Sequence, residues 1–357
     1  MSRPRARDLG LPFPGTPGPW NAITDVPGVR VGFCTLTDPA RRMRTGVTAI
    51  LPRADIGIPR PVAAGHFALN GNGEMTGTHW IEDAGQFIGP IALTNTHAVG
   101  AVHHGLTRWM LRHYGEWFSN HHAWAMPVVA ETYDGVLNDI TALHVTPDHA
   151  EAALAAAASG PVAEGSRGGG NGMIAYEFKA GTGTASRRVG IGGATYTLGV
   201  LVQANHGRRP WLRVLGRPVG ELMPEGQFQT REQGSIIVIL ATDAPLSALS
   251  LRHLARRASL GVARGGTPGG NSSGDIFLAF STADIGPMPA LAGPVLQRNA
   301  VNPEGIDPLY LAGVEAVEEA VINALVAAEP CIAVKPEGLS VPAIDPQRLA
   351  ALWASGT

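Results

Sequence analysis

The chain has 357 residues, of which 45% are hydrophobic and 16% are charged, so it is long and apolar enough to bury a substantial core. Its 27 Lys and Arg residues nearly balance its 29 Asp and Glu residues, which excludes the basic footprint of a protein that binds nucleic acid or an anionic membrane surface. We therefore expect a folded protein whose partner is a small molecule or a peptide.

The first predicted elements are short strands followed by a helix. Runs that favour β-structure cover 29–34 and 47–51. A helix is expected after Thr96, because apolar residues recur at helical spacing from Val99 to Met110. The apolar stretch 125–130 is typical of a strand, and it runs directly into a polar, turn-prone cluster.

The next predicted helix has signals at both ends. Thr146 is a suitable N-cap, Pro147 fits the first helical position, an alanine-rich body extends to Ala158, and Gly160 is expected to end the helix. We interpret this helix as scaffold.

A serine marks the start of the most apolar run in the second half of the chain. Two predicted strands lead to Asn205, and after a loop rich in Gly, Pro and Gln, Ser235 opens the run 236–240. We expect this run to be a buried strand. A helix with Ser247 as its N-cap then follows and is predicted to end at Gly261.

The last predicted elements are a strand over 276–280 and a long helix that begins at Asp307. Strands and helices thus follow one another in a non-alternating order, which favours an α+β fold over a doubly wound sheet. No linker divides the sequence, so we expect one domain over residues 1–357.

The sequence indicates neither export nor a disulfide framework. Its first residues lack the continuous apolar run of a secretory signal, and no stretch approaches the roughly 20 apolar residues of a membrane helix. Cys34 and Cys331 are too few for a disulfide framework or a thiolate metal site, although a single bridge between them stays open. We expect a soluble, cytoplasmic protein with reduced thiols and no membrane partner.

Closely spaced histidines raise the question of a zinc site. They are His97, His103, His104, His121 and His122. The chain has no H-E-x-x-H motif, and the adjacent His103 and His104 would point to different faces of a helix. We therefore interpret these histidines as packed or surface residues, and we expect neither a metal nor another cofactor.

Two glycine-rich motifs are weaker candidates for a site. The segment G-N-S-S-G at 270–274 matches a nucleophile elbow with Ser272 at its centre, but an elbow follows a strand and opens a helix, whereas here a loop precedes and a strand follows. The segment G-S-R-G-G-G-N-G at 165–172 lacks the residues of a P-loop or a dinucleotide site. We interpret it as a tight turn or a wall of the substrate site.

The pair Gly234-Ser235 is compatible with self-cleavage. If the Ser235 hydroxyl attacks the carbonyl carbon of Gly234, an ester forms, and its hydrolysis frees an N-terminal serine. Glycine suits the scissile side because it tolerates strained backbone geometry. The freed amine has an unperturbed pKa of about 7.7 to 8.0. One residue would then supply both nucleophile and base near neutral pH.

Several motifs spread along the chain carry a family resemblance. They are G-N-G-E at 71–74 with T-G-T-H-W at 76–80, T-N-T-H at 94–97, E-T-Y-D-G at 131–135, V-Q-A-N at 202–205, G-S-I-I-V at 234–238 and S-G-D at 273–275. Together they resemble the L-aminopeptidase D-Ala-esterase/amidase family, also called the β-peptidyl aminopeptidases, which includes self-cleaving N-terminal-nucleophile hydrolases. The resemblance covers nearly the whole chain, from Leu9 to about Ala328.

This resemblance implies autoproteolysis between Gly234 and Ser235, which would give an α chain of residues 1–234 and a β chain of residues 235–357. Ser235 would be the nucleophile. Asn205 would be a donor of the oxyanion hole, and Tyr133 is similar to the tyrosine that assists there.

The resemblance also implies roles for three other residues. Ser273 and Asp275 match the serine and the acidic residue that form hydrogen bonds around the new amine, and a spacing of two on an extended chain puts both side chains on one face. The family's acidic residue is Glu, so Asp275 is one methylene shorter, which bears on its reach and on substrate size. Trp124 is similar in position to an aromatic residue that lines the family's substrate pocket, with ordinary core packing as the alternative.

The fold implied by the resemblance is a four-layer α/β/β/α sandwich of the N-terminal-nucleophile hydrolase type. The implied reaction is hydrolysis of the amide or ester bond after a free N-terminal amino acid, in L-amino acid amides or peptides, D-Ala esters or amides, or β-peptides. The implied assembly is a homotetramer of associated α and β chains. An acidic group near the pocket would bind the ammonium group of the substrate.

Two alternatives stay open on the sequence alone. The first is an acyltransferase of the ornithine-acetyltransferase type, against which a nucleophilic Ser rather than Thr and the E-T-Y-D-G motif weigh. The second is an uncleaved and catalytically inert homologue, against which the joint presence of the five site residues weighs. These residues are Tyr133, Asn205, Ser235, Ser273 and Asp275.

Overall fold

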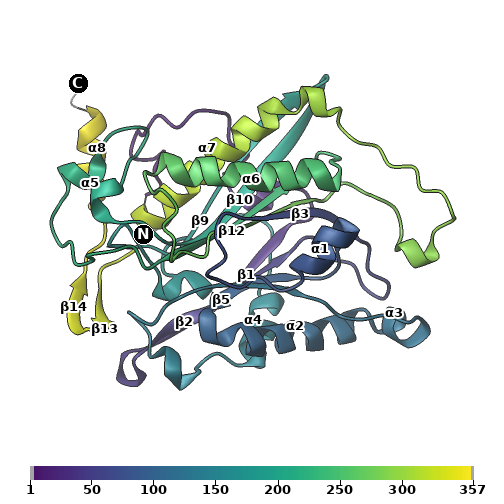
Figure 1. Ribbon diagram of the computed structural model, residues 1–357, viewed down its shortest axis with the longest axis horizontal. Coiled ribbons are helices and arrows are strands. Elements are labelled where there is room, and N and C mark those ends of the chain that lie inside the picture. Colours follow the sequence, from purple (N-terminus) through teal and green to yellow (C-terminus); the bar gives the residue numbers. More distant parts are fainter. Residues whose placement is uncertain (1–3, 355–357) are drawn as a thin grey trace.

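The computed structural model describes residues 4–354 and shows four stacked layers. Two long helices cover the outer face of a six-stranded sheet, a four-stranded sheet packs on its inner face, and two further helices cover the other side of the second sheet (Figure 1). The expected α+β fold and the four-layer α/β/β/α arrangement are confirmed.

The six-stranded sheet carries the residues of greatest interest. Its order is β4-β3-β12-β11-β10-β9, and only the central pair β11 and β12 is parallel. The bounds are β3 Val62–Ala68, β4 Gln86–Phe87, β9 Thr182–Ile191, β10 Ala194–Asn205, β11 Ser235–Thr242 and β12 Ile276–Ser281. Every residue of β11 and β12 is buried, which explains why both strands read as continuous apolar runs rather than alternating ones.

The four-stranded sheet has the order β1-β2-β5-β6, with β5 and β6 parallel. Its bounds are β1 Arg30–Asp38, β2 Met43–Leu51, β5 Ile91–Asn95 and β6 Val128–Thr132. Two short hairpins lie outside the main sheets, formed by β7 Ile174–Ala175 with β8 Phe178–Lys179 and by β13 Cys331–Val334 with β14 Glu337–Val341.

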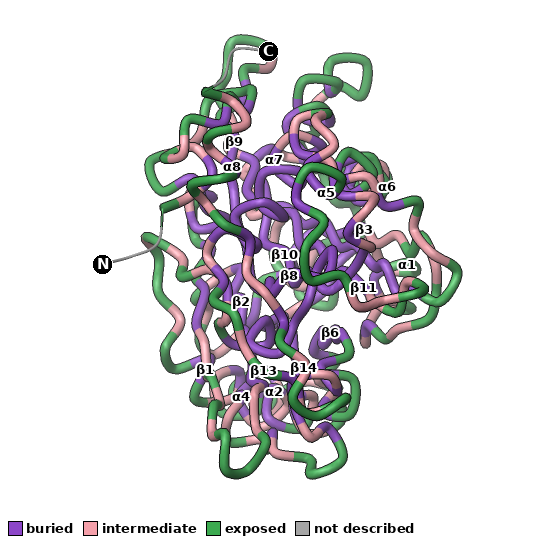
Figure 2. Tube along the Cα trace, turned by 90° about the vertical axis from the view of Figure 1, so that its left-hand side faces the viewer, coloured by how far each residue is buried: buried purple, intermediate pink, exposed green. Residues whose placement is uncertain are grey.

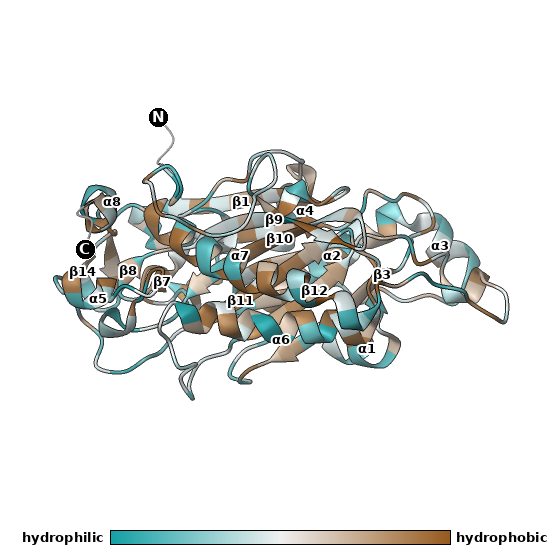
Figure 3. Cartoon of the chain, turned by 90° about the horizontal axis from the view of Figure 1, so that it is seen from above, coloured by the Kyte–Doolittle hydropathy of each residue, from teal (hydrophilic) through white to brown (hydrophobic). Residues whose placement is uncertain are grey.

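Four helices form the outer layers. The helices α6 Ala248–Arg264 and α7 Asp307–Val326 cover the six-stranded sheet, and α2 Val99–His113 and α4 Pro147–Ala155 cover the four-stranded sheet. Figure 3, which looks down on α6 and α7, shows hydrophobic residues along most of α7. The remaining helices are α1 Thr78–Ala84, α3 Gly115–Asn120, α5 Val219–Leu222 and α8 Pro346–Ala354.

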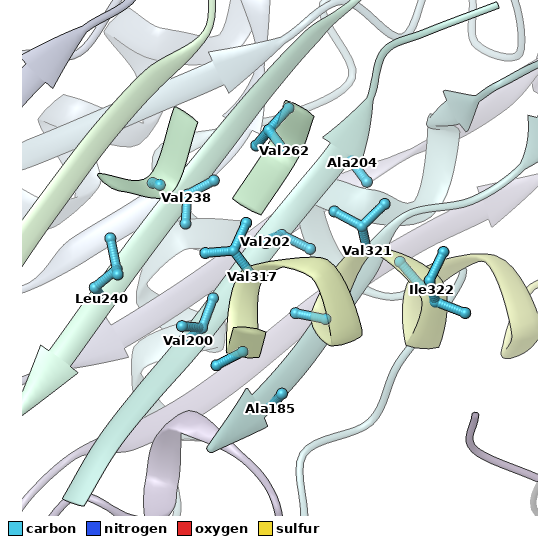
Figure 4. Close-up of a cluster of buried hydrophobic side chains, with 14 of the residues drawn as sticks. Ala185, Val200, Val202, Ala204, Val238, Leu240, Val262, Val317, Val321 and Ile322 are labelled. Atoms are coloured by element: carbon cyan, nitrogen blue, oxygen red, sulfur yellow. The ribbon is translucent and has the colours of Figure 1, made fainter. Parts of the chain in front are cut away.

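Three apolar clusters fill the spaces between the four layers. The largest lies between the six-stranded sheet and its helices, where Val200, Val238 and Leu240 meet Val317 and Val321 (Figure 4). Burying such a side chain contributes about 1.5 to 3 kcal/mol. Figure 2 shows the buried residues concentrated in the interior around β8 and β10. Every residue of β11 is also buried, so the centre of the six-stranded sheet is shielded from solvent.

Several element boundaries differ from the sequence-based expectation. The helix expected to end at Gly261 continues to Arg264, because Gly261 lets α6 approach α7: a Cβ atom there would stand 2.6 Å from Val317 Cβ. The alanine-rich helix ends at Ala155 rather than reaching Ala158, which instead forms a β-bridge with Val31.

The cysteines of the described chain, Cys34 and Cys331, are both free. Among the helices within residues 4–354, none combines the length and the apolar character needed to cross a membrane.

Candidate active site

Ser235 is the first residue of β11 and lies opposite Asn205, the last residue of β10. It is only 8% exposed. Its Oγ accepts a hydrogen bond of 3.0 Å from the amide of Gly274. Because β12 runs parallel to β11, the residues just before β12 lie beside Ser235, and the topology therefore brings 273–275 to the same sheet edge.

Asn205 is held at this edge from two sides. Its Oδ1 accepts a hydrogen bond of 2.9 Å from the amide of Ile174, and its Nδ2 donates one of 3.0 Å to the carbonyl oxygen of Tyr133. One amide hydrogen of Asn205 remains for a substrate oxygen. The side chain is therefore pre-oriented, as an oxyanion-hole donor must be.

Ser273 and Asp275 project to one face of the extended chain, as their spacing predicts. Ser273 Oγ donates a hydrogen bond of 2.5 Å to Asp275 Oδ1, which also accepts one of 3.2 Å from the amide of Ile236. Burial raises the pKa of Asp275 to about 6; the Ser273 hydroxyl opposes this rise, whereas the nearby Glu232 carboxylate adds to it. The shorter acidic side chain thus reaches the residue next to Ser235.

Tyr133 follows the end of β6 and is 40% exposed. Its ring lies over Gly135, where a Cβ atom would stand 2.3 Å from the phenolic oxygen. Tyr133 lines a cavity of about 100 Å³ together with Asn205, Gly234 and their chain neighbours His206 and Gln233. Gly172, from the G-S-R-G-G-G-N-G segment, lines the same cavity.

Gly234 fits this edge only because it has no side chain. A Cβ atom at position 234 would stand 1.9 Å from the carbonyl oxygen of Asn205 and 2.7 Å from the Cα atom of His206. The end of β10 and the start of β11 are therefore in closer contact than any other residue would permit.

Trp124 does not join these residues. It lies in the loop before β6, at the end of that strand away from Tyr133, and packs edge-on against Trp80 with ring centroids 5.6 Å apart. There it lines a separate cavity of about 400 Å³, whose lining includes Trp117 and Met126 but none of the residues around Ser235. The structure thus brings together all the expected site residues except Trp124.

Glu131 is a candidate that the sequence-based reasoning did not single out. Its Oε1 accepts a hydrogen bond of 3.0 Å from the amide of Glu74, and its Oε2 accepts one from the Thr96 hydroxyl. Burial raises the pKa of this carboxyl group, and no basic side chain of residues 4–354 forms an ion pair with it. A Cβ atom on Gly73 would contact both Glu131 Oε1, at 3.2 Å, and Gly274 Cα, at 3.3 Å, so Glu131 lies close to the loop that binds Ser235.

The glycine-rich segment 165–172 is a site of close packing. Its last residues form a buried turn in which the amides of Gly168 and Gly169 donate to the hydroxyls of Thr35 and Thr48. These amides are therefore already paired and form no phosphate cradle. The interpretation as a tight turn is confirmed, and Gly172 provides part of a cavity wall.

Ser272 and the five histidines considered for a zinc site do not line the cavity beside Gly234, although His97 opposes the rise in the pKa of Glu131. His97 Nδ1 contacts the carbonyl oxygen of Ile140, and His121 packs on Trp117. Ser272 is exposed in the turn before β12. Across residues 4–354, His, Cys, Asp and Glu side chains form no group of three that could hold a metal ion.

The chain is similar to known peptidases over nearly its whole length. A model of peptidase family S58 matches residues 21–337. The β-peptidyl aminopeptidase BapA of Sphingosinicella microcystinivorans is 49% identical over 350 residues, which cover 91% of this chain and 86% of that protein. BapA of Sphingosinicella xenopeptidilytica is 45% identical over 351 residues, with 92% and 86% covered.

The fold of the chain is also similar to solved structures of aminopeptidases. L-aminopeptidase D-Ala-esterase/amidase from Ochrobactrum anthropi, described as a prototype for the serine aminopeptidases and a new variant among the Ntn hydrolase fold, has a TM-score of 0.94 and 55% identity, with 99% of each chain covered. A β-aminopeptidase from Burkholderia sp. has a TM-score of 0.90 and 48% identity, again with 99% of each chain covered.

Proposed function

Because the chain belongs to peptidase family S58 and is a hydrolase of the N-terminal-nucleophile aminopeptidase type, we propose that it creates its own nucleophile by cutting the bond between Gly234 and Ser235. The products would be an α chain of residues 1–234 and a β chain of residues 235–357. The observation that carries this proposal is the position of Ser235, at the buried start of a strand, after a residue that can only be glycine.

Self-cleavage needs no other reactant than water. Ser235 Oγ attacks the carbonyl carbon of Gly234, and the hydroxyl proton passes to the departing nitrogen of Ser235. The resulting ester joins Gly234 to the side chain of Ser235. Water then hydrolyses this ester and leaves a carboxylate on Gly234 and a free amine on Ser235.

The freed amine then serves as the base in peptide hydrolysis. It accepts the proton of Ser235 Oγ as that oxygen attacks the substrate carbonyl, and it returns the proton to the leaving amine. The free hydrogen of Asn205 Nδ2 and the Tyr133 hydroxyl stabilise the oxyanion, where one donor is worth about 2.7 to 4 kcal/mol of barrier. Water releases the acyl group from the acyl-enzyme.

Ser273 and Asp275 hold the amine in place. The contact between Asp275 Oδ1 and the amide of Ile236 puts this carboxylate beside residue 235. Its negative charge favours the ammonium form that the amine takes when it has accepted the serine proton. Ser273 orients the carboxylate through its hydrogen bond of 2.5 Å.

Glu131 binds the free amino group of the substrate. It is a buried carboxylate without an ion-pair partner among residues 4–354, and a substrate ammonium would supply that partner. Substrates would accordingly be short peptides, amides or esters with a free amino terminus. The similarity to both β-peptidyl aminopeptidases and an L-aminopeptidase D-Ala-esterase/amidase supports activity on more than one of these classes.

The two fragments would stay together after cleavage, because β11 and β12 of the β chain lie between β3 and β10 of the α chain in one sheet. We also propose the family's assembly of four α/β pairs. Exposed apolar side chains such as Trp124 and Met126 support a buried contact surface. The two free cysteines support a cytoplasmic location.

Intact-mass spectrometry of the purified protein tests the proposal. We expect two fragments that meet at Gly234 and Ser235 in the wild type and in the control Ser272→Ala, and one unbroken chain in Ser235→Ala. An active wild-type enzyme with the mass of the full chain would contradict the proposal. An unbroken and inactive wild type would support the inert alternative. The acyltransferase alternative is not favoured by the similar proteins.

A further inference from the structure

Residues 228–234, which lead to the proposed cleavage point, belong to no helix or strand, yet carboxylates hold this segment at both ends. We call it the pre-scissile segment. At its start, Glu177 Oε2 accepts hydrogen bonds from the amides of Phe228 and Gln229, the second at 2.9 Å. The side chain of Arg208 adds a hydrogen bond of 3.2 Å to the carbonyl oxygen of Gln229.

Glu177 is itself immobilised in the turn of the hairpin β7–β8. It is fully buried, and its Oε1 accepts a hydrogen bond of 3.0 Å from the amide of Arg209. The guanidinium of Arg209, also fully buried, donates to the carbonyl oxygens of Tyr176 and Glu177 at 2.9 Å each. Tyr176 and Glu177 have φ angles of +50° and +60°, a strained conformation for non-glycine residues that these contacts maintain.

Glu232 holds the other end of the segment, two residues before Gly234. Its Oε1 accepts hydrogen bonds from the amide of Gly207, at 2.8 Å, and from Thr267 Oγ1, at 3.2 Å. Its Oε2 accepts one of 3.0 Å from the amide of Gly270. A Cβ atom on Gly270 would stand 2.2 Å from Glu232 Oε2, so this glycine gives the carboxylate the room that it occupies.

These three donors come from both flanks of the site. Gly207 lies two residues after Asn205, whereas Thr267 and Gly270 belong to the loop that leads to Ser273. The hydrogen bonds of Glu232 go to these two flanking segments and not to Ser235, so the carboxylate is placed to fix the chain. Hydrogen bonds to a charged group are about twice as strong as neutral ones.

We propose that Glu177 and Glu232 form a two-point clamp on the pre-scissile segment, in which Glu232 is the positioning residue that places the carbonyl carbon of Gly234 for attack by Ser235. This inference rests on the proposed self-cleavage. Without the clamp, the segment before the bond would sample many conformations, and correct placement of reacting atoms accounts for a large part of the rate in such intramolecular reactions.

Cell-free synthesis followed by a time course of fragment formation tests the clamp. We expect Glu232→Ala to slow cleavage by about tenfold or more, and Glu232→Gln to slow it less, because an amide oxygen can still accept hydrogen bonds. The matched control is Glu225→Gln, from the same loop. The carboxylate of Glu225 pairs with Arg348 at the surface, so this variant should be cleaved at the wild-type rate.

A second measurement separates positioning from general destabilisation. In the uncleavable Ser235→Ala protein, adding Glu232→Ala should speed hydrogen exchange at the amides of Gly207 and Gly270 and leave exchange in the rest of the chain unchanged. Slow cleavage together with faster exchange throughout the chain would overturn the clamp.

The clamp and the proposed function fail differently. A wild type that is never cut between Gly234 and Ser235 would overturn the proposed self-cleavage. If the wild type is cut and the Glu232→Ala variant is cut at the same rate, only the clamp is overturned.

Discussion

Ser273 donates its hydroxyl hydrogen to the carboxylate of Asp275 over 2.5 Å, and both side chains are buried. This hydrogen bond favours the charged form of Asp275, whereas burial favours the neutral form and raises the pKa to about 6. The charge state of Asp275 near neutral pH therefore depends on Ser273.

The pH dependence of hydrolysis should reveal this link. In Ser273→Ala the charged form of Asp275 loses a hydrogen bond, so the pKa of Asp275 rises further. If the carboxylate must be charged to hold the amine of Ser235, the acid limb of the kcat/KM profile moves to higher pH. A p-nitroanilide assay across the pH range measures this shift, with the exposed Ser272→Ala as control. An acid limb at the wild-type position would show that the charge of Asp275 is not required for catalysis.

Loss of the proposed oxyanion donor should reduce turnover. We expect Asn205→Ala to lower kcat by about 10² to 10³. Asn205→Asp is the sharper variant, because it keeps an acceptor for the amide of Ile174 and removes the donor Nδ2. Steady-state kinetics on the cleaved fraction checks both variants. Wild-type kcat in Asn205→Asp would remove this residue from the oxyanion hole.

A methyl group at Gly234, the residue before the proposed cleavage point, should block processing. Gly234→Ala places a Cβ atom 1.9 Å from the carbonyl oxygen of Asn205, so the strand ends must move apart and the attack geometry is lost. We expect an uncut chain on a denaturing gel. Gly293→Ala is the matched control, because a Cβ atom there meets nothing within 4 Å and cleavage should be normal. Normal cleavage of Gly234→Ala would show that the close contact is not required.

Asp134 should make the stability of the uncleaved protein depend on pH. Its Oδ1 accepts a hydrogen bond of 3.1 Å from Asn138. Burial raises its pKa from 3.8 to about 6, and the side chains of Thr45, Asn138 and Asn95 oppose this rise. Between these values the folded chain holds a proton that the unfolded chain has lost, so stability falls as pH rises.

Asp134→Asn removes this loss. In the Ser235→Ala chain, we expect the stability of the Asn variant relative to its parent to improve from pH 4 to pH 7 by up to about 3 kcal/mol. Urea unfolding at several pH values measures the difference. A relative stability that stays constant with pH would mean that Asp134 is ionised in the fold at no cost.

The sequence predicts best what depends on neighbouring residues. The strand that starts at Ser235, the shared face of Ser273 and Asp275, and the N-cap at Thr146 follow from local patterns and are seen in the structure. Gly261 wrongly predicts the end of α6, because glycine also occurs where two helices pack closely. This role can be recognised only when the partner helix is known.

What the sequence does not reveal depends on contacts between distant segments. Glu131 is a candidate because it contacts Glu74 and lies near the loop that contains Gly274. Glu177 and Glu232 are candidates because they bind amides that only folding brings together. Trp124 lies apart from Ser235 because it precedes β6 and Tyr133 follows it. Glu131 is the first residue of the E-T-Y-D-G motif, but the motif alone does not show which distant segments its residues contact.

The hydroxyl of Ser235 finds its partner in Gly274, 39 residues downstream, and its cross-strand neighbour in Asn205 upstream. A nascent chain that has been synthesised only as far as β11 has Asn205 but still lacks Gly274. Maturation would therefore wait until the central sheet is complete, and a truncated or misfolded translation product would remain in one piece. Cleavage would then occur only in chains that have folded correctly.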